Sequence, residues 1–212
     1  MPDESPLSAG ATTPRTVAVL LAAGAGSRFS DIRHKLLSRL DDQGPCVGAR
    51  ALGSALNANI GPVVVVTGAL DVAALRVDRT FELLLDDPGA VIRHNPSWAD
   101  GQSTSVHAGV EAAKEFGADA VVVGLADQPF ITPEAWRTVA NGLGSITVAT
   151  YDGRRGNPVK LHASVWGLLP ASGDEGARVL MRSRPDLVVE VPCSGSPADI
   201  DTVEDLHQWQ NN

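Results

Sequence analysis

VAVLLAAGAGSRFSDIRHKLL, residues 17–37, contains an apolar run, a turn of small residues and then a group of cations. The branched side chains of the apolar run are typical of a strand that is covered on both faces. Residues 22–26 present little side chain, so their backbone N–H groups can approach a ligand closely. Arg28, Arg33 and Lys35 then place three positive charges within eight positions. The stretch therefore predicts a phosphate-binding turn between a strand and its counter-charges.

Three other interpretations of this turn have to be weighed. The glycines can simply make a tight connection between a strand and a helix. A dinucleotide-binding turn has the pattern G-x-G-x-x-G, but Gly24 and Gly26 are followed by Phe29 at the third position, which disfavours an NAD(P) site. A P-loop has the pattern G-x-x-x-x-G-K-[ST], which does not occur in this chain. Because the chain has only three lysines, the presence of Lys35 just after the turn favours a polyphosphate ligand.

Length and charge limit the class of protein. The 212 residues suffice for one α/β domain, which we expect over residues 16–212. Residues 1–15 are rich in Pro, Ser and Ala and have no apolar core segment, so we expect a flexible tail and no signal peptide. The net charge of -8 disfavours nucleic acid and anionic membranes as partners. With no long apolar run, and with Cys46 and Cys193 outside any metal-binding spacing, we expect a cytoplasmic protein.

Short apolar runs alternate with segments of helical period along the chain. Strands are predicted at residues 16–21, 62–67, 90–94, 120–125, 146–151, 159–162 and 187–191. Helices are predicted at 47–57 and from about residues 103 and 133, and capping-box spacing predicts two more after Ser172 and Thr202. This alternation predicts an α/β fold with a doubly wound, mostly parallel sheet. Ligands of such sheets bind beyond the carboxyl ends of the strands.

Carboxylates follow the fourth predicted strand and recur near the C-terminus. Asp127 can hold Mg²⁺ against phosphates gathered by the first turn, or it can cap the turn that follows it. Asp199 and Asp201 alternate along an extended segment and so point to the same side, where either can supply a second metal ligand. Glu204 and Asp205 lie in the first turn of a predicted helix and suit its dipole, which indicates a structural role.

Six motifs of the chain occur in the order in which one enzyme family carries them. They are LAAGAGSRF with a following lysine, HNPSWADGQSTSVHAGV, LADQPFITPEAW, GRRGNPVKL, GDEGARVLM and DIDTVEDL. Together they resemble the MobA-like nucleotidyltransferases over roughly residues 17–206. The greatest similarity is to the branch that joins CMP to molybdopterin. The resemblance implies a single-domain, Rossmann-like fold of the nucleotide-diphospho-sugar transferase type, with CTP as substrate and Mg²⁺ as cofactor.

The residues and the resemblance together assign roles to positions of this chain. Catalysis is assigned to Arg28, Lys35 and Asp127, and the metal to Asp127, Asp199 and Asp201. The nucleotide is assigned to Leu21, Ala22, Ala23, Gly24, Ala25, Gly26, Ser27, Arg28, Lys35, Gly68, Gly101, Ser103, Thr104 and Ser105. The acceptor is assigned to Gly156, Asn157, Pro158, Gly173, Asp174, Gly176 and Arg178.

The chain departs from the family pattern at several positions. The usual R-M-G-x-x-K becomes Arg28-Phe-Ser-Asp-Ile-Arg-His-Lys35, which delays the lysine by two positions and replaces the glycine with serine. Asn157 stands where the family often has histidine. Ala23 stands where guanylyl-transferring relatives carry a second glycine, so the turn resembles that of the cytidylyl branch.

The implied reaction needs no protein nucleophile, because an ionised acceptor phosphate attacks the α-phosphorus of CTP and pyrophosphate leaves in line. In agreement, the chain has no G-x-S-x-G elbow, and its five histidines show no ligand spacing, so we interpret them as turn, surface or helix residues. Arg154, Arg155 and Arg178 are available to an anionic acceptor, although the first two can equally belong to a solvated turn.

Alternatives within and outside this enzyme class stay open at this point. The acceptor can be another phosphorylated molecule, such as a sugar phosphate or phospholactate. Some chains that resemble this family are described as NAD(P)H-linked reductases of dyes formed in nicotine breakdown. A third alternative is a binding module that hands over a cofactor without catalysis. For the enzyme we expect small-molecule substrates, the NTP and the pterin cofactor, and as a protein partner a molybdoenzyme or its chaperone.

Overall fold

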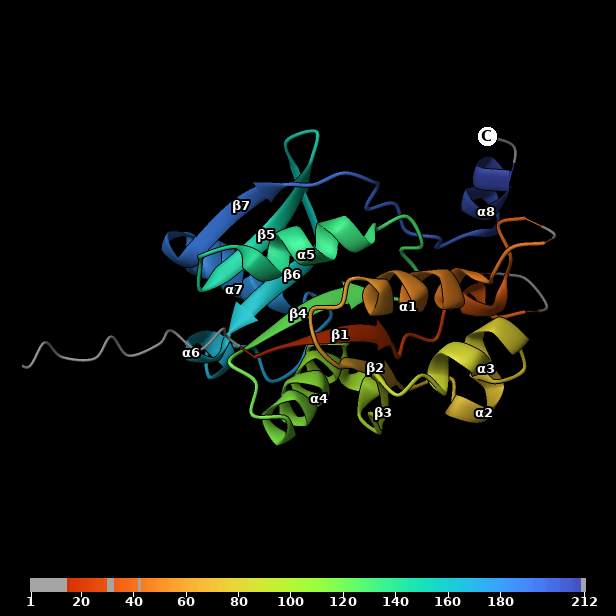
Figure 1. Cartoon of the computed structure of the whole chain (residues 1–212), viewed down its shortest axis with the longest axis horizontal. Coiled ribbons are helices and arrows are strands. Elements are labelled where there is room, and N and C mark those ends of the chain that lie inside the picture. The colour runs from red at the N-terminus through yellow and green to blue at the C-terminus, as the bar shows by residue number, and fades with distance from the viewer. Residues whose placement is uncertain (1–14, 30–32, 42, 211–212) are drawn as a thin grey trace, which may run out of the picture.

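The structure is a computed structural model, and it describes residues 15–29, 33–41 and 43–210. The described residues form one seven-stranded sheet in the order β3-β2-β1-β4-β6-β5-β7 (Figure 1). The strands are β1 (Thr16–Ala22), β2 (Val63–Thr67), β3 (Ala90–His94), β4 (Ala120–Leu125), β5 (Ile146–Tyr151), β6 (Arg154–His162) and β7 (Val188–Pro192). The tail predicted at residues 1–15 lies outside the described residues except for Arg15, whose backbone N–H donates to Asp119 Oδ2 at 3.0 Å.

The sheet is mostly parallel, as the alternation of elements predicts. β1 runs parallel to β2 and β4, β2 is parallel to β3, and β5 is parallel to β7. β6 is inserted antiparallel between β4 and β5. It also begins earlier than the predicted strand 159–162, because Arg154, Arg155 and Gly156 pair with the end of β5. The basic segment after β5 is therefore part of the sheet.

Helices cover both faces of the sheet, which confirms the doubly wound α/β class (Figure 1). One face packs against α1 (Val47–Asn57), α2 (Val72–Leu75), α3 (Arg79–Leu85), α5 (Pro133–Asn141) and α8 (Val203–Gln210). The other face packs against α4 (Gln102–Glu115), α6 (Ala163–Trp166) and α7 (Ala177–Ser183). The part of the chain that the structure describes also contains the short 3-10 helices η1 (Lys35–Leu37), η2 (Trp98–Asp100) and η3 (Pro185–Leu187). Among the described residues, no helix has the length and the apolar character needed to cross a membrane.

The central strand β1 is buried on both faces. Its even-numbered residues from Ala18 to Ala22 belong to one apolar cluster, and its odd-numbered residues from Val17 to Leu21 belong to the other. This alternation is the period of a strand, and it explains why the sequence reads as a continuous apolar run. Burial of the run between two helical layers fixes the direction of β1 and thus the place where its following turn emerges.

The strand order reverses direction at β1, and the site lies beyond that point. The chain continues from β1 to β2 on one side, whereas β4 lies on the other side. The turns after β1 and β4 therefore emerge next to each other at the carboxyl ends of the strands, where ligands of such sheets bind. The C-terminal segment joins them, because the backbone N–H of Ile200 donates to Asp127 O at 2.9 Å and the Ile200 side chain is fully buried.

Two predicted capping boxes have different outcomes. The prediction at Thr202 is confirmed, since Asp205 Oδ2 accepts from the Thr202 N–H at 2.8 Å and Thr202 Oγ1 accepts from the Asp205 N–H at 3.1 Å. The prediction at Ser172 is wrong, because α7 begins only at Ala177. The preceding segment is held outside a helix by Gly173, whose N–H donates to Asp100 O at 3.0 Å and whose carbonyl accepts from Ser103 N at 2.9 Å.

The packing of α4 on β1 depends on a glycine, and this generates a test of the fold. A Cβ on Gly109 would lie 2.3 Å from Cγ1 of Val19, whereas a Cβ on Gly53 in α1 would have its nearest neighbour at 3.7 Å. We expect Gly109→Ala to destabilise the protein by about 1–3 kcal/mol through overpacking. The matched Gly53→Ala should be neutral or stabilising by up to about 1 kcal/mol, because alanine is the better helix former. Urea unfolding of both variants measures this, and equal stabilities would contradict the described packing.

Candidate functional site

The turn after β1 is exposed at its tip and anchored at both ends. Gly24, Ala25 and Ser27 are exposed, while Ala22 and Phe29 are buried. Gly26 has a φ of 63°, which lets its carbonyl accept from the Phe29 N–H at 2.9 Å and closes the turn. The burial of Phe29, only 7% exposed, fixes the end of the turn on the core.

Gly68, which directly follows the neighbouring strand β2, supports the turn. The Ala69 N–H donates to Ala23 O at 3.0 Å. A Cβ on Gly68 would lie 2.7 Å from the same Ala23 oxygen and 2.6 Å from Cβ of Trp98. Only glycine allows this close approach, so the predicted nucleotide residue Gly68 acts by shaping the turn.

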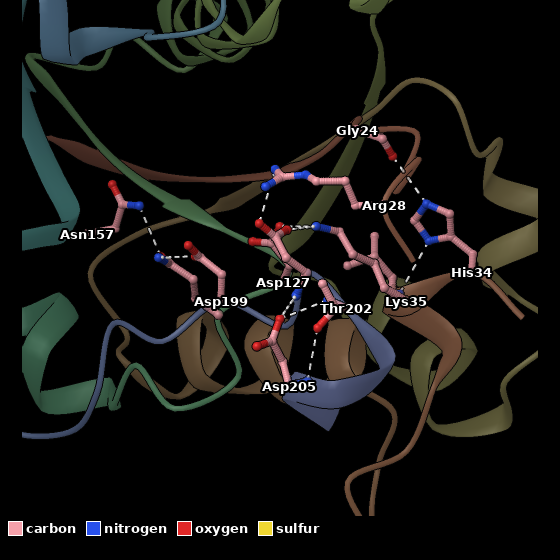
Figure 2. Close-up of polar contacts among 12 residues, drawn as sticks. Gly24, Arg28, His34, Lys35, Asp127, Asn157, Asp199, Thr202 and Asp205 are labelled. Carbon is pink, nitrogen blue, oxygen red and sulfur yellow. Dashed lines mark hydrogen bonds and ion pairs between the residues drawn. The ribbon is translucent and has the colours of Figure 1, made fainter. Parts of the chain in front are cut away.

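An ionic cluster lies beneath the turn and joins three distant segments of the chain (Figure 2). Lys35 Nζ donates to Asp127 Oδ2 at 2.6 Å and to Asp201 Oδ1 at 2.7 Å. Arg28 Nη2 lies 3.1 Å from the other oxygen of Asp201. The Lys35 side chain is 10% exposed and that of Arg28 is 76% exposed, so the first is an interior cation and the second faces solvent. All three residues predicted as catalytic are thereby brought together.

The carboxylates determine the charge state of Lys35. Burial acts to lower the pKa of Lys35, but the negative charge of Asp127 and the hydrogen bonds to Asp127 and Asp201 outweigh it and raise this pKa. Lys35 is therefore an ammonium at neutral pH. The pKa of Asp199 is raised by burial and by the charges of Asp127 and Asp201. The site thus holds a surplus of carboxylates around one buried cation.

The donor set fits a divalent cation. Asp127 Oδ1 is buried and has no hydrogen-bond partner among the described residues. Asp127 Oδ2 and Asp201 Oδ1 both point to the position of Lys35 Nζ. Carboxylate oxygens are the ligands that Mg²⁺ prefers, and Mg²⁺ is often held by one or two carboxylates plus substrate phosphates. No three His, Cys, Asp or Glu side chains of the described residues converge on a metal position. These residues therefore fit an arrangement in which two protein carboxylates and the phosphate oxygens of a substrate together hold the metal ion.

Asp199 has a different environment from Asp201. Its Oδ1 accepts from Gln128 Nε2 at 2.6 Å, and Gln128 Oε1 in turn accepts from Asn157 Nδ2 at 3.0 Å (Figure 2). Gln128 is 3% exposed and also donates to Pro197 O at 2.9 Å. The geometry favours Asp201 as the second metal ligand. Gln128 was missed by sequence reasoning, although it follows Asp127 directly in the LADQPF motif.

His34 is a second residue that sequence reasoning missed. Its Nδ1 accepts from the Leu36 N–H at 3.3 Å, which caps η1 and leaves the proton on Nε2. Nε2 lies 3.2 Å from Gly24 O and therefore donates to it. The ring also covers Gly26, where a Cβ would lie 2.9 Å from Nε2. His34 thus connects the turn to the segment that carries Lys35. In the sequence, only its position immediately before the lysine indicated this role.

A cavity of about 320 Å³ lies between the turn and the start of α4. It is lined by Leu21, Ala23, Gly24, Ala25, Trp98, Ala99, Gly101, Gln102, Ser105, Leu125, Asp127 and Asp174. Six predicted nucleotide residues are among these, whereas Trp98, Gln102 and Asp174 were not assigned to the nucleotide. Of the other predicted residues, Ser103 is buried, and Thr104 accepts from Asn95 Nδ2 at 2.8 Å and supports the loop. Gly26, Ser27 and Arg28 lie outside this lining.

A second cavity of about 260 Å³ adjoins the first and shares Leu21, Gln102 and Leu125 with it. Its remaining lining is Val106, Val123, Val148, Arg155, Gly156, Asn157, Val159, Glu175, Ala177, Arg178, Met181 and Arg182. The predicted acceptor residues Gly156, Asn157 and Arg178 are here, whereas Asp174 lines the first cavity. Pro158 follows in β6, and Gly176 is the N-cap of α7. Gly173 packs against Gly101 at the junction of the cavities.

Comparison with known proteins finds a family model and two curated proteins that match most of this chain. A family model described as "MobA-like NTP transferase domain" matches residues 18–188 of this chain. The chain is 32% identical to nicotine blue oxidoreductase of Paenarthrobacter nicotinovorans, over 92% of this chain and 96% of that protein. It is 31% identical to the purine catabolism protein PucB of Bacillus subtilis, over 91% of this chain and 95% of that protein.

Solved structures agree on the fold. A nucleotidyl transferase from Methanothermobacter thermautotroptrophicus superposes with a TM-score of 0.73 at 24% identity, over 93% of this chain and 96% of that one. Rv0371c from Mycobacterium tuberculosis, solved as a complex with manganese, has a TM-score of 0.67 at 23% identity, over 93% of this chain and 99% of that one. The predicted nucleotidyltransferase-type fold is confirmed.

The contacts of His34 generate a prediction on pH. Burial lowers the pKa of His34, although the hydrogen bond with Gly24 acts in the opposite direction. As pH falls below about 6.5, the unfolded chain takes up the proton before the folded one, so stability falls. We expect the melting temperature of the wild type to drop more between about pH 7.5 and 5.5 than that of His34→Asn. Identical slopes for the wild type and His34→Asn would refute this role of His34.

Proposed function

The chain belongs to the MobA-like NTP transferase domain family, and from this premise we propose that it transfers CMP from CTP to the terminal phosphate of molybdopterin, with release of pyrophosphate. The observation that carries the proposal is the ionic cluster of Lys35, Asp127 and Asp201 beneath a turn of small residues, beside two adjoining cavities. One cavity suits a nucleotide and the other suits an acceptor. Their junction lies next to the charged groups that phosphoryl chemistry requires.

The nucleotide end of the site supplies charge and main-chain donors. The exposed tip of the turn can present N–H groups to a triphosphate, and Arg28 reaches the same region from its end. Ala23 in place of a second glycine supports CTP as the nucleotide. Two cationic side chains and one divalent ion roughly offset the charge of a triphosphate.

Asp127 and Asp201 are the residues that would hold Mg²⁺. When bound, Mg²⁺ would neutralise phosphate charge and orient the oxygens of the nucleotide. The unpartnered Oδ1 of Asp127 supports this assignment, as does the manganese complex of the structural neighbour. Asp199 is held by Gln128 and would act by fixing the loop that carries Asp201.

The acceptor cavity combines apolar walls with arginines. A flat heterocycle fits valine and leucine walls, and a phosphate needs a cation. Arg155 pairs with Glu190 at 2.7 Å and Arg182 pairs with Glu175, whereas Arg178 has no ion-pair partner among the described residues. We assign Arg178 to the acceptor phosphate. A phosphate oxygen of the acceptor then forms the bond to the α-phosphorus of CTP, and the bond to the pyrophosphate oxygen breaks.

The direct test is pyrophosphate release from CTP, GTP and ATP, each with Mg²⁺, with and without molybdopterin. We expect release with CTP and molybdopterin together, and at least about tenfold less with GTP or ATP. Asp127→Asn should lose most of the metal-dependent turnover, because it removes a charged ligand. A folded protein that binds the pterin and gives no pyrophosphate with CTP would refute the proposal.

The role of Arg178 gives a separate prediction on the acceptor. Loss of a charge-assisted hydrogen bond costs about 1.5–3 kcal/mol, so Arg178→Met should raise the KM for molybdopterin about tenfold or more and leave the KM for CTP unchanged. Arg184→Met is the matched control, because Arg184 pairs with Asp186 at 2.7 Å outside both cavities. An unchanged KM for the acceptor in Arg178→Met would place the phosphate elsewhere.

A second candidate function follows from the relative named nicotine blue oxidoreductase. In this alternative the turn would bind NAD(P)H. The burial of Phe29, where a dinucleotide turn needs its third glycine, weighs against it. Oxidation of NADPH with a dye substrate, in the absence of any NTP, would favour the reductase. Pyrophosphate release with a different phosphorylated acceptor would keep the transferase and change only the acceptor.

A molybdoenzyme or its chaperone is the partner that we propose for the product, since a pterin dinucleotide serves as a cofactor only after insertion into an enzyme. The substrates themselves are small molecules.

A further inference from the structure

The geometry points to Lys35 as a built-in cation that occupies the metal position until the nucleotide arrives, so that the site takes a metal–triphosphate complex and discriminates against the free metal ion. The inference rests on the proposed function in one respect only, the identity of Asp127 and Asp201 as metal ligands. The inference is that the nucleoside triphosphate is bound together with its metal ion. It does not depend on which base or acceptor is used.

The Lys35 ammonium and a metal ion would occupy the same position. Lys35 Nζ lies 2.6 Å from Asp127 Oδ2 and 2.7 Å from Asp201 Oδ1 (Figure 2). A divalent ion bound to the same two oxygens would sit about 2.1 Å from each. The ammonium and the ion therefore compete for one place between the carboxylates.

The charge of Lys35 disfavours the binding of a free metal ion. The Lys35 side chain is 10% exposed, so its repulsion of a second cation is weakly screened. A free metal ion must displace this ammonium and leave it buried without a counter-charge, which is costly. A metal ion that arrives with a triphosphate brings phosphate oxygens to which the displaced ammonium can donate.

Exchange of the ammonium for the ion needs only a side-chain movement. The backbone at Lys35 is held by Leu36, which is 3% exposed, and by the His34 cap on η1. Lysine carries its charge on a flexible four-carbon stem, which can redirect Nζ while the backbone stays in place. The exposed turn that would receive the phosphates lies on the same segment, between Gly24 and Arg28.

The test measures Mn²⁺ binding to the nucleotide-free protein by electron paramagnetic resonance. We expect Lys35→Met, which keeps the length and removes the charge, to bind Mn²⁺ at least about fivefold more tightly than the wild type. Lys35→Gln should do the same. Adding Asp201→Asn to Lys35→Met should abolish the gain, because one of the two carboxylates is lost.

Lys114→Met is the control for net charge. Lys114 lies on the exposed surface of α4 and pairs with Glu111, so this substitution changes the charge of the protein equally but leaves the cluster intact. Its Mn²⁺ affinity should equal that of the wild type. If Lys35→Met is less stable, Mn²⁺ alone should raise its melting temperature by more than it raises that of the wild type. Unchanged or weaker Mn²⁺ binding in the Lys35 variants, or no larger thermal shift, would overturn the inference.

The readout contains neither CTP nor molybdopterin, so it separates this inference from the proposed function. Tighter Mn²⁺ binding in the Lys35 variants supports the inference even when no pyrophosphate is formed. Cytidylyl transfer by a protein whose Lys35 variants gain no Mn²⁺ affinity would uphold the proposed function and reject the inference.

Discussion

The pairing of Lys35 with Asp127 and Asp201 is the interaction on which the site depends. It joins the segment after β1, the end of β4 and the C-terminal extension, three parts of the chain separated by as many as 166 positions. A buried ammonium needs counter-charges, and two carboxylates at this depth need a cation, so each partner holds the others in place. The hydrogen bond from Ile200 N to Asp127 O fixes the same junction through the backbone. The backbone of this junction is thus held in place by contacts within the protein.

The topology of the sheet explains why these segments meet. β1 and β4 are neighbours although β2 and β3 lie between them in the sequence, and the turns after both strands emerge at the reversal point of the strand order. The insertion of β6 next to β4 then brings Asn157 to Gln128 and places the cavity lined by Arg178 beside the cavity lined by Asp127. In a chain with a net charge of -8, the few cations near the turn can still act on an anionic ligand, because charges act mainly over short distances in salt solution.

The two cavities share a wall but differ in character. The first cavity, which we propose for the nucleotide, is lined by the turn, by residues before α4 and by Asp127. The second cavity, which we propose for the acceptor, is lined mainly by apolar side chains, with arginines from β6 and α7. Gln128 links Asp199 to Asn157 by two hydrogen bonds and so connects the carboxylates to the wall of the second cavity.

The sequence by itself determined the α/β class, because branched apolar runs report strands buried on both faces, and the order of six motifs indicated the family. It also determined the capping of α8 at Thr202, which depends on residues three positions apart. Only the tertiary structure decided that Ser172 starts no helix, because Gly173 is bonded to the loop before α4. Only the tertiary structure showed that Asp201 contacts Lys35 whereas Asp199 contacts Gln128. It also showed the hydrogen bond between His34 and the turn. Local patterns record periodicity and caps, whereas the partner of a charged or polar side chain is set by which distant segments the sheet places side by side.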